Sequence, residues 1–307
     1  MTSLRAYVLA WAVRRKIRAR LGPMLDVARV RRTLEGPAFP EPGGVTYEPG
    51  SVGGIPCERV RRGAGEDRPR LFYLHGGGFI ACSPRTHRPL TGYFAQRGFD
   101  VFVPDYRLAP EHPFPAALDD ALAAWRAVSA GGPAVIAGDS AGGNLALALM
   151  LRARDAGLPL PRAAALFSPA TDMLGSGQSY RTNAGRDAMF DPEGLRRLAP
   201  LYLAGADPAG PLVSPLYADL AGLPPLLVHV GERELLRDDS SRLAEAARAA
   251  GVSVDLTVFP VVPHVWQFAH GFLPEARRSL DAAAAFLRAH AADAAKPADA
   301  AAQVDQT

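Results

Sequence analysis

Residues 134–151 read AVIAGDSAGGNLALALML, and this stretch decides the fold. It begins with a short apolar run typical of a buried strand, and residues 141–156 favour a helix. Between the two lies a G-x-S-x-G pattern, in which Ser140 is flanked by Gly138 and Gly142. A strand that turns sharply into a helix leaves room only for a hydrogen atom two positions on either side of the apex. The pattern therefore predicts a strand–turn–helix unit with Ser140 at its apex, the position of a nucleophile.

Outward from this unit, short apolar strands alternate with longer helices. Such alternation predicts an α/β fold, with a mostly parallel sheet covered by helices on both faces. The strand candidates are residues 45–48, 55–60, 71–75, 99–103, 134–138, 163–167, 226–231 and 253–259. The helix candidates are residues 3–34 with an interruption at Pro23, 87–97, 115–129, 141–156, 192–203, 238–250 and 275–290.

The remaining segments indicate one domain with an insertion. A chain of 307 residues with 48% hydrophobic residues can form a single α/β domain with a large core. Residues 172–215 contain more Gly, Ser, Pro and Asn than a crossover needs, and a substrate lid would lie there, near the carboxyl ends of the strands. We expect residues 36–44 to form a loop and the tail from residue 291 to be disordered.

Basic side chains are concentrated at the N-terminus. Residues 1–32 contain nine Lys or Arg and one acid, a net charge of +8, so the rest of the chain sums to −5 within the total of +3. A basic helix of this kind is usually a solvated face, although it can also contact phosphates or anionic lipid. This distribution and the lack of a nucleic-acid-reading motif argue against a nucleic-acid partner.

The cysteines and apolar stretches predict a cytoplasmic protein. Cys57 and Cys82 make no disulfide framework and have no metal-ligand spacing, so reduced thiols are expected. The apolar stretch 6–13 runs directly into the basic residues 14–16 and lacks a cleavage site, which argues against a signal peptide. No other stretch has the length of a membrane span without charges, so stable membrane insertion is not expected.

A glycine run upstream of Ser140 predicts an anion-stabilising loop. HGGGF (75–79) follows an apolar strand, and successive glycines let backbone N–H groups approach a ligand closely. We expect Gly77, Gly78 and Ala141 to donate to an oxyanion, with a contribution from the dipole of the helix that starts at Ala141. A phosphate cradle is the alternative, but no G-K-[S/T] follows and G-x-G-x-x-G is not met.

The order of residues along the chain selects the candidate base. In this fold the serine is followed by an acid and then by a histidine. Among the seven histidines only His264, His270 and His290 come late enough. His264 follows the last strand candidate in a loop, where a base would lie over the site, whereas His270 and His290 are interpreted as structural or exposed. His75 is interpreted as a hydrogen-bonded member of the glycine loop.

The candidate acid lies in the loop after strand 226–231, where four carboxylates occur. The acid must reach the imidazole Nδ1 from the end of the strand, which favours an early position. Glu234 is the first choice and Asp238 the second, with Glu232 and Asp239 as further alternatives. Those not used are interpreted as solvated charges or as the acidic first turn of the next helix.

With these motifs in place, residues 33–287 resemble the bacterial hormone-sensitive-lipase-like esterases. The GDSAG form indicates the subgroup of that family (family IV) named after the motif. The residues that carry the resemblance are HGGGF (75–79), DYRLAPEHPFPA (105–116), GDSAGG (138–143), SP (168–169), SPL (214–216) and PH (263–264).

The resemblance implies an eight-stranded α/β-hydrolase core over residues 41–290. It implies a helical cap formed by residues 1–40 and by an insertion at about residues 175–212, and it leaves residues 291–307 as a tail. It further implies hydrolysis of short- to medium-chain acyl esters through a Ser-acid-His triad, with no metal or cofactor. The natural substrate and the oligomeric state are left open, a homodimer being one alternative.

One departure and one structural role accompany the resemblance. At the position of Glu234 the family usually has Asp followed by Pro and Leu, whereas here Leu235 and Leu236 follow. Glu is an accepted triad acid in this fold. The resemblance also implies that Arg107 and Glu111 form a buried polar network beneath the site.

Other functions of the same fold stay open at this point. An amidase, deacetylase or lactonase would use the same triad, and the fold alone does not separate them from an esterase. Non-catalytic small-molecule receptors also resemble these esterases, but they lack the triad histidine, whereas this chain has His264.

Overall fold

The computed structural model describes residues 2–21, 26–35, 39–63 and 68–292, and its centre is an eight-stranded sheet in the order β1-β2-β4-β3-β5-β6-β7-β8. β2 runs antiparallel to β1 and β4, and all other neighbours are parallel. The predicted mostly parallel sheet is confirmed, and every strand overlaps its predicted range, although β1 extends to Val52, beyond the predicted range 45–48. The strands are β1 (Thr46–Val52), β2 (Ile55–Arg61), β3 (Arg70–Leu74), β4 (Asp100–Pro104), β5 (Ala134–Asp139), β6 (Ala164–Phe167), β7 (Leu226–Gly231) and β8 (Val254–Phe259).

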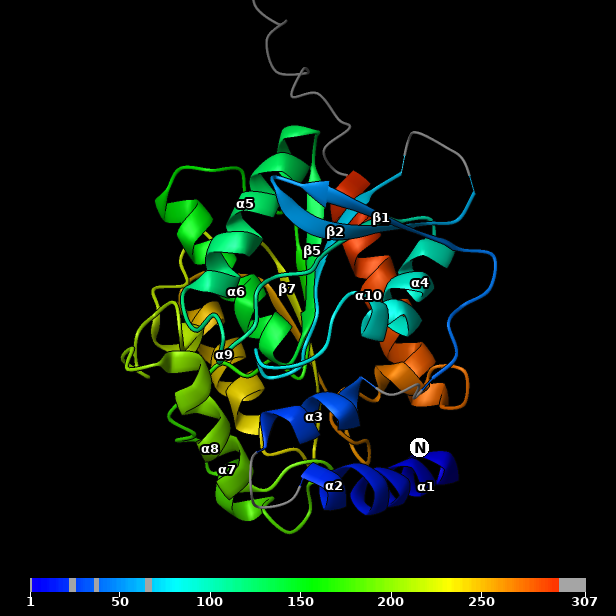
Figure 1. Cartoon of the computed structure of the whole chain (residues 1–307), viewed down its shortest axis with the longest axis vertical. Coiled ribbons are helices and arrows are strands. Elements are labelled where there is room, and N and C mark those ends of the chain that lie inside the picture. Colours follow the sequence, from blue (N-terminus) through cyan, green and yellow to red (C-terminus); the bar gives the residue numbers. More distant parts are fainter. Residues whose placement is uncertain (1, 22–25, 36–38, 64–67, 293–307) are drawn as a thin grey trace, which may run out of the picture.

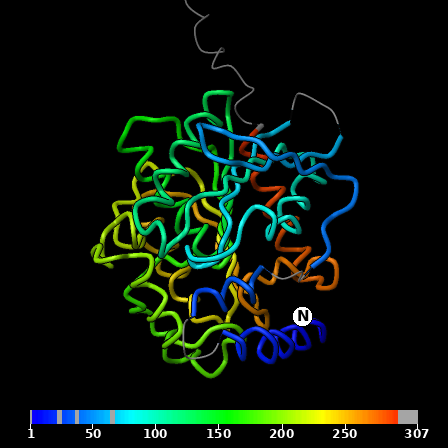
Figure 2. Tube along the Cα trace, in the orientation of Figure 1, coloured from blue at the N-terminus to red at the C-terminus, as the bar shows by residue number. Residues whose placement is uncertain are grey.

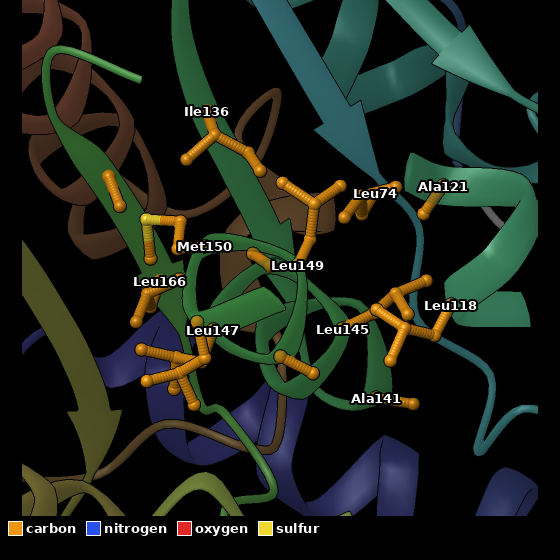
Figure 3. Close-up of a cluster of buried hydrophobic side chains, with 14 of the residues drawn as sticks. Leu74, Leu118, Ala121, Ile136, Ala141, Leu145, Leu147, Leu149, Met150 and Leu166 are labelled. Carbon is orange, nitrogen blue, oxygen red and sulfur yellow. The ribbon is translucent and has the colours of Figure 1, made fainter. Parts of the chain in front are cut away.

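Helices cover both faces of the sheet, as expected. Because side chains of a strand alternate between faces, Phe72 and Leu74 pack with α5, α6 and α9, whereas Leu71 and Tyr73 pack with α4 and α10. Figure 3 shows the first of these cores, where the leucines of α6 meet β3, β5 and β6. The helices are α4 (Arg88–Gln96), α5 (Ala116–Ala130), α6 (Ala141–Asp155), α9 (Arg237–Ala249) and α10 (Pro274–Ala292).

A second group of helices lies at one end of the molecule, near the carboxyl ends of the parallel strands (Figure 1). We call this group the cap helices. The Cα trace in Figure 2 shows that its N-terminal part lies beside the segment between β6 and β7, and Arg18 donates to the carbonyls of Ala184 and Asp187 there. The cap helices are α1 (Leu4–Val13), a π-helical turn (Arg14–Arg18), α2 (Ala19–Leu21), α3 (Val27–Leu34), α7 (Ser179–Thr182) and α8 (Pro192–Leu203).

Some predictions need adjustment or fall outside the described residues. The helix expected over residues 3–34 is divided into separate segments, with a π-helical turn at residues 14–18. Its predicted interruption at Pro23 is not among the described residues. The described part of the predicted loop 36–44 contains no helix or strand, whereas residues 36–38 are outside the description. Helix α10 ends at Ala292, and residues 293–307 of the predicted tail are not described.

The predicted buried network of Arg107 and Glu111 is wrong. The Arg107 side chain is 48% exposed and pairs with Asp120, and that of Glu111 is 54% exposed and pairs with Arg31 of α3. Long charged side chains keep their heads in water because burial of a charge is costly. The Arg31 guanidinium also donates to the carbonyl of Ala109, so this stretch holds α3 against the core.

Candidate active site

Ser140 lies at the apex of a strained turn between β5 and α6. Its φ is 55° and its ψ is −120°, a backbone conformation that residues with a side chain rarely adopt. A Cβ atom on Gly138 would collide with the carbonyl of Gly142, and one on Gly142 would collide with the carbonyls of Leu74 and His75. The turn geometry predicted from the two glycines is therefore present, and Ser140 faces a cavity.

The glycine run follows β3 and faces the same cavity. Gly77 and Gly78 have φ values of 115° and 64°, which only glycine adopts without strain. The backbone N–H groups of Gly77, Gly78 and Ala141 donate no hydrogen bond to any described residue. The structure thus places three free donors around Ser140, and the third lies at the positive end of the α6 dipole.

The buried carboxylate of Asp139 holds the start of the glycine run in place. Asp139 accepts hydrogen bonds from the Gly76 N–H at 3.2 Å and from the Tyr73 hydroxyl at 2.8 Å, and its carboxylate is 3.2 Å from His87 Nε2. Burial raises the pKa of Asp139, but His87 and the donated hydrogen bonds outweigh it, so the net pKa is lowered. Asp139 therefore remains ionised and links the residue before Ser140 to the start of the glycine run.

His75 is a structural member of this loop, as the sequence indicated. Its ring is fully buried, stacks on Tyr106 with 4.2 Å between ring centroids, and contacts the Gly76 carbonyl through Nδ1 at 2.8 Å. Burial, with the nearby His87, lowers the pKa of His75 to about 3. His75 is therefore neutral and donates from Nδ1 to the Gly76 carbonyl, which makes it unsuited to act as a base near neutral pH.

His264 and Glu234 form a buried pair beside Ser140. His264 Nδ1 is 2.6 Å from Glu234 Oε2, and both side chains are almost fully buried. His264 Nε2 is buried and has no hydrogen-bond partner among the described residues, although His264 and Ser140 line the same cavity. Among the described residues no hydrogen bond joins His264 to Ser140. This contact is often long before substrate binds.

Further contacts fix Glu234 in place. Its Oε1 accepts hydrogen bonds from the Gly231 N–H at 2.6 Å and from the Ser168 hydroxyl at 2.8 Å. Burial alone lowers the pKa of His264, but the hydrogen bond and negative charge of Glu234 outweigh it, so the net pKa of His264 is raised. The arrangement leaves Oε2 of Glu234 free to hold the imidazole in one orientation.

The other three acids of this loop lie elsewhere. Asp238 accepts a hydrogen bond from the Ser179 N–H at 2.9 Å. Asp239 is fully buried and accepts from the N–H groups of Thr171 and Asp172 at 2.8 and 3.0 Å. Glu232 contacts Arg237 at 3.7 Å. Of the four candidates, only Glu234 reaches His264.

Sequence reasoning missed three residues that shape this pair. Ser168 follows β6 directly and donates a hydrogen bond to Glu234, and its occurrence in an SP pair after a strand was the available signal. Phe190 packs edge-on against the His264 ring with 4.8 Å between centroids. Buried Asp187 accepts from the N–H groups of Phe190 and Leu235 at 2.9 and 2.8 Å, which ties the insertion to the Glu234 loop. No periodic pattern in the insertion signalled these two.

The cavity that joins these residues has a volume of about 440 Å³. Its floor carries Ser140, His264 and the glycine run, and its walls are mostly apolar. Both the N-terminal helices and the segment between β6 and β7 supply wall residues, so the cap forms part of the wall of the cavity that holds Ser140. The apolar wall residues of the cap are Leu9, Val13, Ile17, Leu21, Val30, Leu34, Met189, Phe190, Leu195, Leu198 and Ala199.

Comparison with known proteins matches this geometry to a family. The alpha/beta hydrolase fold family matches residues 71–268. An acetyl-hydrolase of Streptomyces hygroscopicus is 45% identical over 243 residues, which are 78% of this chain and 81% of that protein. An esterase of Acinetobacter venetianus is 37% identical over 248 residues, 79% of this chain and 82% of that protein.

Solved structures that resemble this chain point to the same family as these relatives. The crystal structure of EstE5 superposes with a TM-score of 0.90 at 38% identity, and the match covers 94% of this chain and 99% of that chain. An esterase from the bacterial hormone-sensitive lipase family superposes with a TM-score of 0.87 at 39% identity, covering 95% of this chain and 99% of its own.

The chain belongs to the alpha/beta hydrolase fold family. Within that fold it is a member of the bacterial hormone-sensitive-lipase-like esterases, as the sequence motifs indicated. No helix among the described residues is long and apolar enough to cross a membrane.

Proposed function

We propose that this chain hydrolyses carboxylic esters with Ser140 as nucleophile, His264 as general base and Glu234 as the acid that orients His264. The protein is a carboxylesterase. The 2.6 Å contact between His264 Nδ1 and Glu234 Oε2 carries the proposal of the triad, because it directs the unpaired Nε2 atom into the cavity that holds Ser140. Covalent labelling of Ser140 tests it.

In the first half-reaction His264 Nε2 takes the hydroxyl proton of Ser140 as the oxygen attacks the ester carbonyl. The carbonyl oxygen becomes an oxyanion, which accepts hydrogen bonds from the free N–H groups of Gly77, Gly78 and Ala141. Removing one such donor typically costs about 3–4 kcal/mol of transition-state stabilisation. The ester bond to the alcohol then breaks, and His264 gives its proton to the departing oxygen.

In the second half-reaction water replaces the alcohol. His264 takes a proton from water, whose oxygen attacks the acyl-enzyme carbonyl and regenerates the oxyanion. The bond to Ser140 Oγ breaks, the proton returns to Ser140, and the carboxylic acid leaves. No step requires a metal or an organic cofactor.

The acyl group is proposed to be short to medium in length, because the walls above Ser140 are apolar and the cavity measures about 440 Å³. Deleting residues 1–35 removes Leu9, Val13 and Ile17 from the wall, so we expect lower activity and an altered chain-length preference. The measurement is kcat/KM on nitrophenyl acetate, butyrate, octanoate and decanoate.

A point variant tests the same wall without removing a segment. Val13→Trp would fill part of the cavity, so kcat/KM for the octanoate ester should fall by about tenfold relative to the acetate ester. Unchanged relative rates in both the deletion and the point variant would contradict the role of the N-terminal helices in acyl binding.

The pH dependence follows from the protonation state of His264. Only the neutral ring can accept the Ser140 proton, and the net pKa of His264 is raised. We therefore expect kcat/KM to rise with pH along a limb whose midpoint lies above the ordinary histidine value of about 6.5. The residual activity of Glu234→Gln should show a midpoint at lower pH, because the raising charge is gone. Rates are best read at the isosbestic wavelength of nitrophenol; a wild-type midpoint below the ordinary value would contradict the assignment.

Amide, lactone and acetyl hydrolysis are alternatives with the same triad. The 45% identical relative is named an acetyl-hydrolase, which supports including acetyl esters among the substrates tested. Rates on matched esters and anilides separate an esterase from an amidase. A rapid burst of nitrophenol, equal to the enzyme concentration, would exclude a non-catalytic receptor.

The unpaired thiols of the two cysteines support our proposal of a cytoplasmic location. Cys57 and Cys82 are both buried and free in the structure. Unpaired thiols are typical of proteins in a reducing compartment. Fractionation of cells that produce the protein tests this location.

A further inference from the structure

Helix α1 carries an apolar stripe on its outer surface. Leu4, Val8 and Trp11 are 83%, 56% and 61% exposed. Their spacing places them on one face of the helix, one above the other. Tyr7 on the same helix and Phe272 beside it are also exposed, at 48% and 44%. Grouped apolar side chains of this size on a protein surface mark an interaction site.

The opposite face of α1 accounts for the role of this helix inside the protein. Ala6 is fully buried in a core cluster with Val262 and Trp266, and Leu9 and Val13 line the cavity above Ser140. The stripe of Leu4, Val8 and Trp11 contributes to neither the cores nor the cavity of the described residues. Packing within the described residues therefore does not account for the apolar stripe, which indicates a binding partner outside the protein.

Unbalanced positive charge surrounds the stripe. Exposed basic residues lie within it and on both sides, and none of them pairs with a carboxylate of a described residue. Arg15 instead lies 5.6 Å from the ring centroid of Trp11. Residues 1–32 carry a net charge of +8, whereas the rest of the chain sums to −5. The exposed basic residues are Arg5, Arg14, Arg15, Lys16 and Arg20.

We propose that the outer face of α1 docks on the surface of an anionic phospholipid bilayer. Leu4, Val8 and Trp11 would enter the boundary between headgroups and acyl chains, while the flanking cations meet lipid phosphates. A second copy of the chain fits this face less well, because symmetric pairing would bring two strongly basic segments together. The reverse face of the docked helix walls the cavity of Ser140, so docking holds that cavity beside a source of lipophilic esters.

Tryptophan fluorescence reports this docking directly. Trp11 is 61% exposed, whereas Trp125 and Trp266 are each 1% exposed, so a spectral change on binding comes from Trp11. Vesicles of phosphatidylglycerol and phosphatidylcholine should shift the emission to shorter wavelength, and brominated acyl chains should quench it. The protein should bind vesicles of phosphatidylcholine alone at least tenfold more weakly. This difference corresponds to the attraction that roughly one or two basic residues gain at an anionic surface. Trp11→Phe should still sediment with anionic vesicles but lose the spectral change.

Two variants separate the apolar and the charged contributions. We expect Trp11→Ser and Arg15→Glu each to lower the vesicle partition coefficient by about tenfold. The matched control is Arg126→Glu, an exposed arginine on α5 at the opposite end of the molecule in Figure 1, which should bind as the wild type does. All three should turn over nitrophenyl acetate at the wild-type rate, since none of these side chains lines the cavity.

Three results would overturn the proposal. The first is no binding to anionic vesicles at about 0.15 M salt, with unchanged Trp11 emission. The second is equal loss of binding in Arg15→Glu and Arg126→Glu, which would indicate attraction without a docking face. The third is a dimer in solution that Trp11→Ser converts to a monomer by light scattering, which would assign the stripe to a second copy of the chain.

Discussion

Replacing Ser140 with alanine is expected to lower kcat for an ester by about four to six orders of magnitude. Alanine removes the only atom that forms the acyl-enzyme, while the oxyanion donors and the cavity remain and support a small residual rate. The Cβ atom and the turn are retained, so the free energy of unfolding should change little. Steady-state and single-turnover rates on nitrophenyl butyrate, with thermal unfolding of the same samples, check this.

Cys82→Ala is the control for that result. Cys82 also lines the cavity, but burial raises the pKa of its thiol to about 12, so no thiolate is available to attack an ester. We expect this variant to keep most of the wild-type activity. Near-normal turnover in Ser140→Ala, or a collapse in Cys82→Ala with an intact fold, would assign the nucleophile to another residue.

Replacing Glu234 with glutamine is expected to lower kcat by about three to four orders of magnitude. Glutamine keeps the shape but loses the charge that stabilises the imidazolium, and it can hold His264 in the wrong tautomer. Its amide also replaces an acceptor of the Gly231 N–H and the Ser168 hydroxyl. The measurement is kcat/KM on nitrophenyl acetate together with the pH profile.

Asp238→Asn is the matched change in the same loop. The Asp238 carboxylate accepts from Ser179 and contacts Arg237, away from His264. We expect this variant to retain activity within about tenfold of the wild type. Any loss would come from a small shift of the loop that carries Glu234, not from a missing catalytic group. A larger loss in Asp238→Asn than in Glu234→Gln would transfer the role of the acid to Asp238.

Local backbone constraints explain which parts of the site could be predicted. The turn at Ser140 and the run through Gly77 and Gly78 depend on glycines that permit close approach and positive φ, and such requirements are readable in the sequence. Most of the parallel strands were equally readable, because they are short apolar runs between turn signals. The more polar β1 was predicted only over residues 45–48, whereas it extends to Val52. These features depend on neighbours within a few residues.

Contacts between distant segments set the limit of the sequence reasoning. Four acids followed β7, and only the fold shows that Glu234 turns towards His264, held by Gly231 and Ser168. The burial of Arg107 and Glu111 was misjudged because their partners, Asp120 and Arg31, come from two helices whose positions the motif does not specify.

The most direct test of the central claim is the site of covalent acylation. The enzyme is mixed with nitrophenyl butyrate, quenched in acid within milliseconds and digested, and the acylated peptide is sequenced by mass spectrometry. We predict a butyryl group on Ser140, in the peptide that contains GDSAG, and none in Ser140→Ala. A butyryl group on any other residue that forms and decays at the rate of turnover would contradict the proposal.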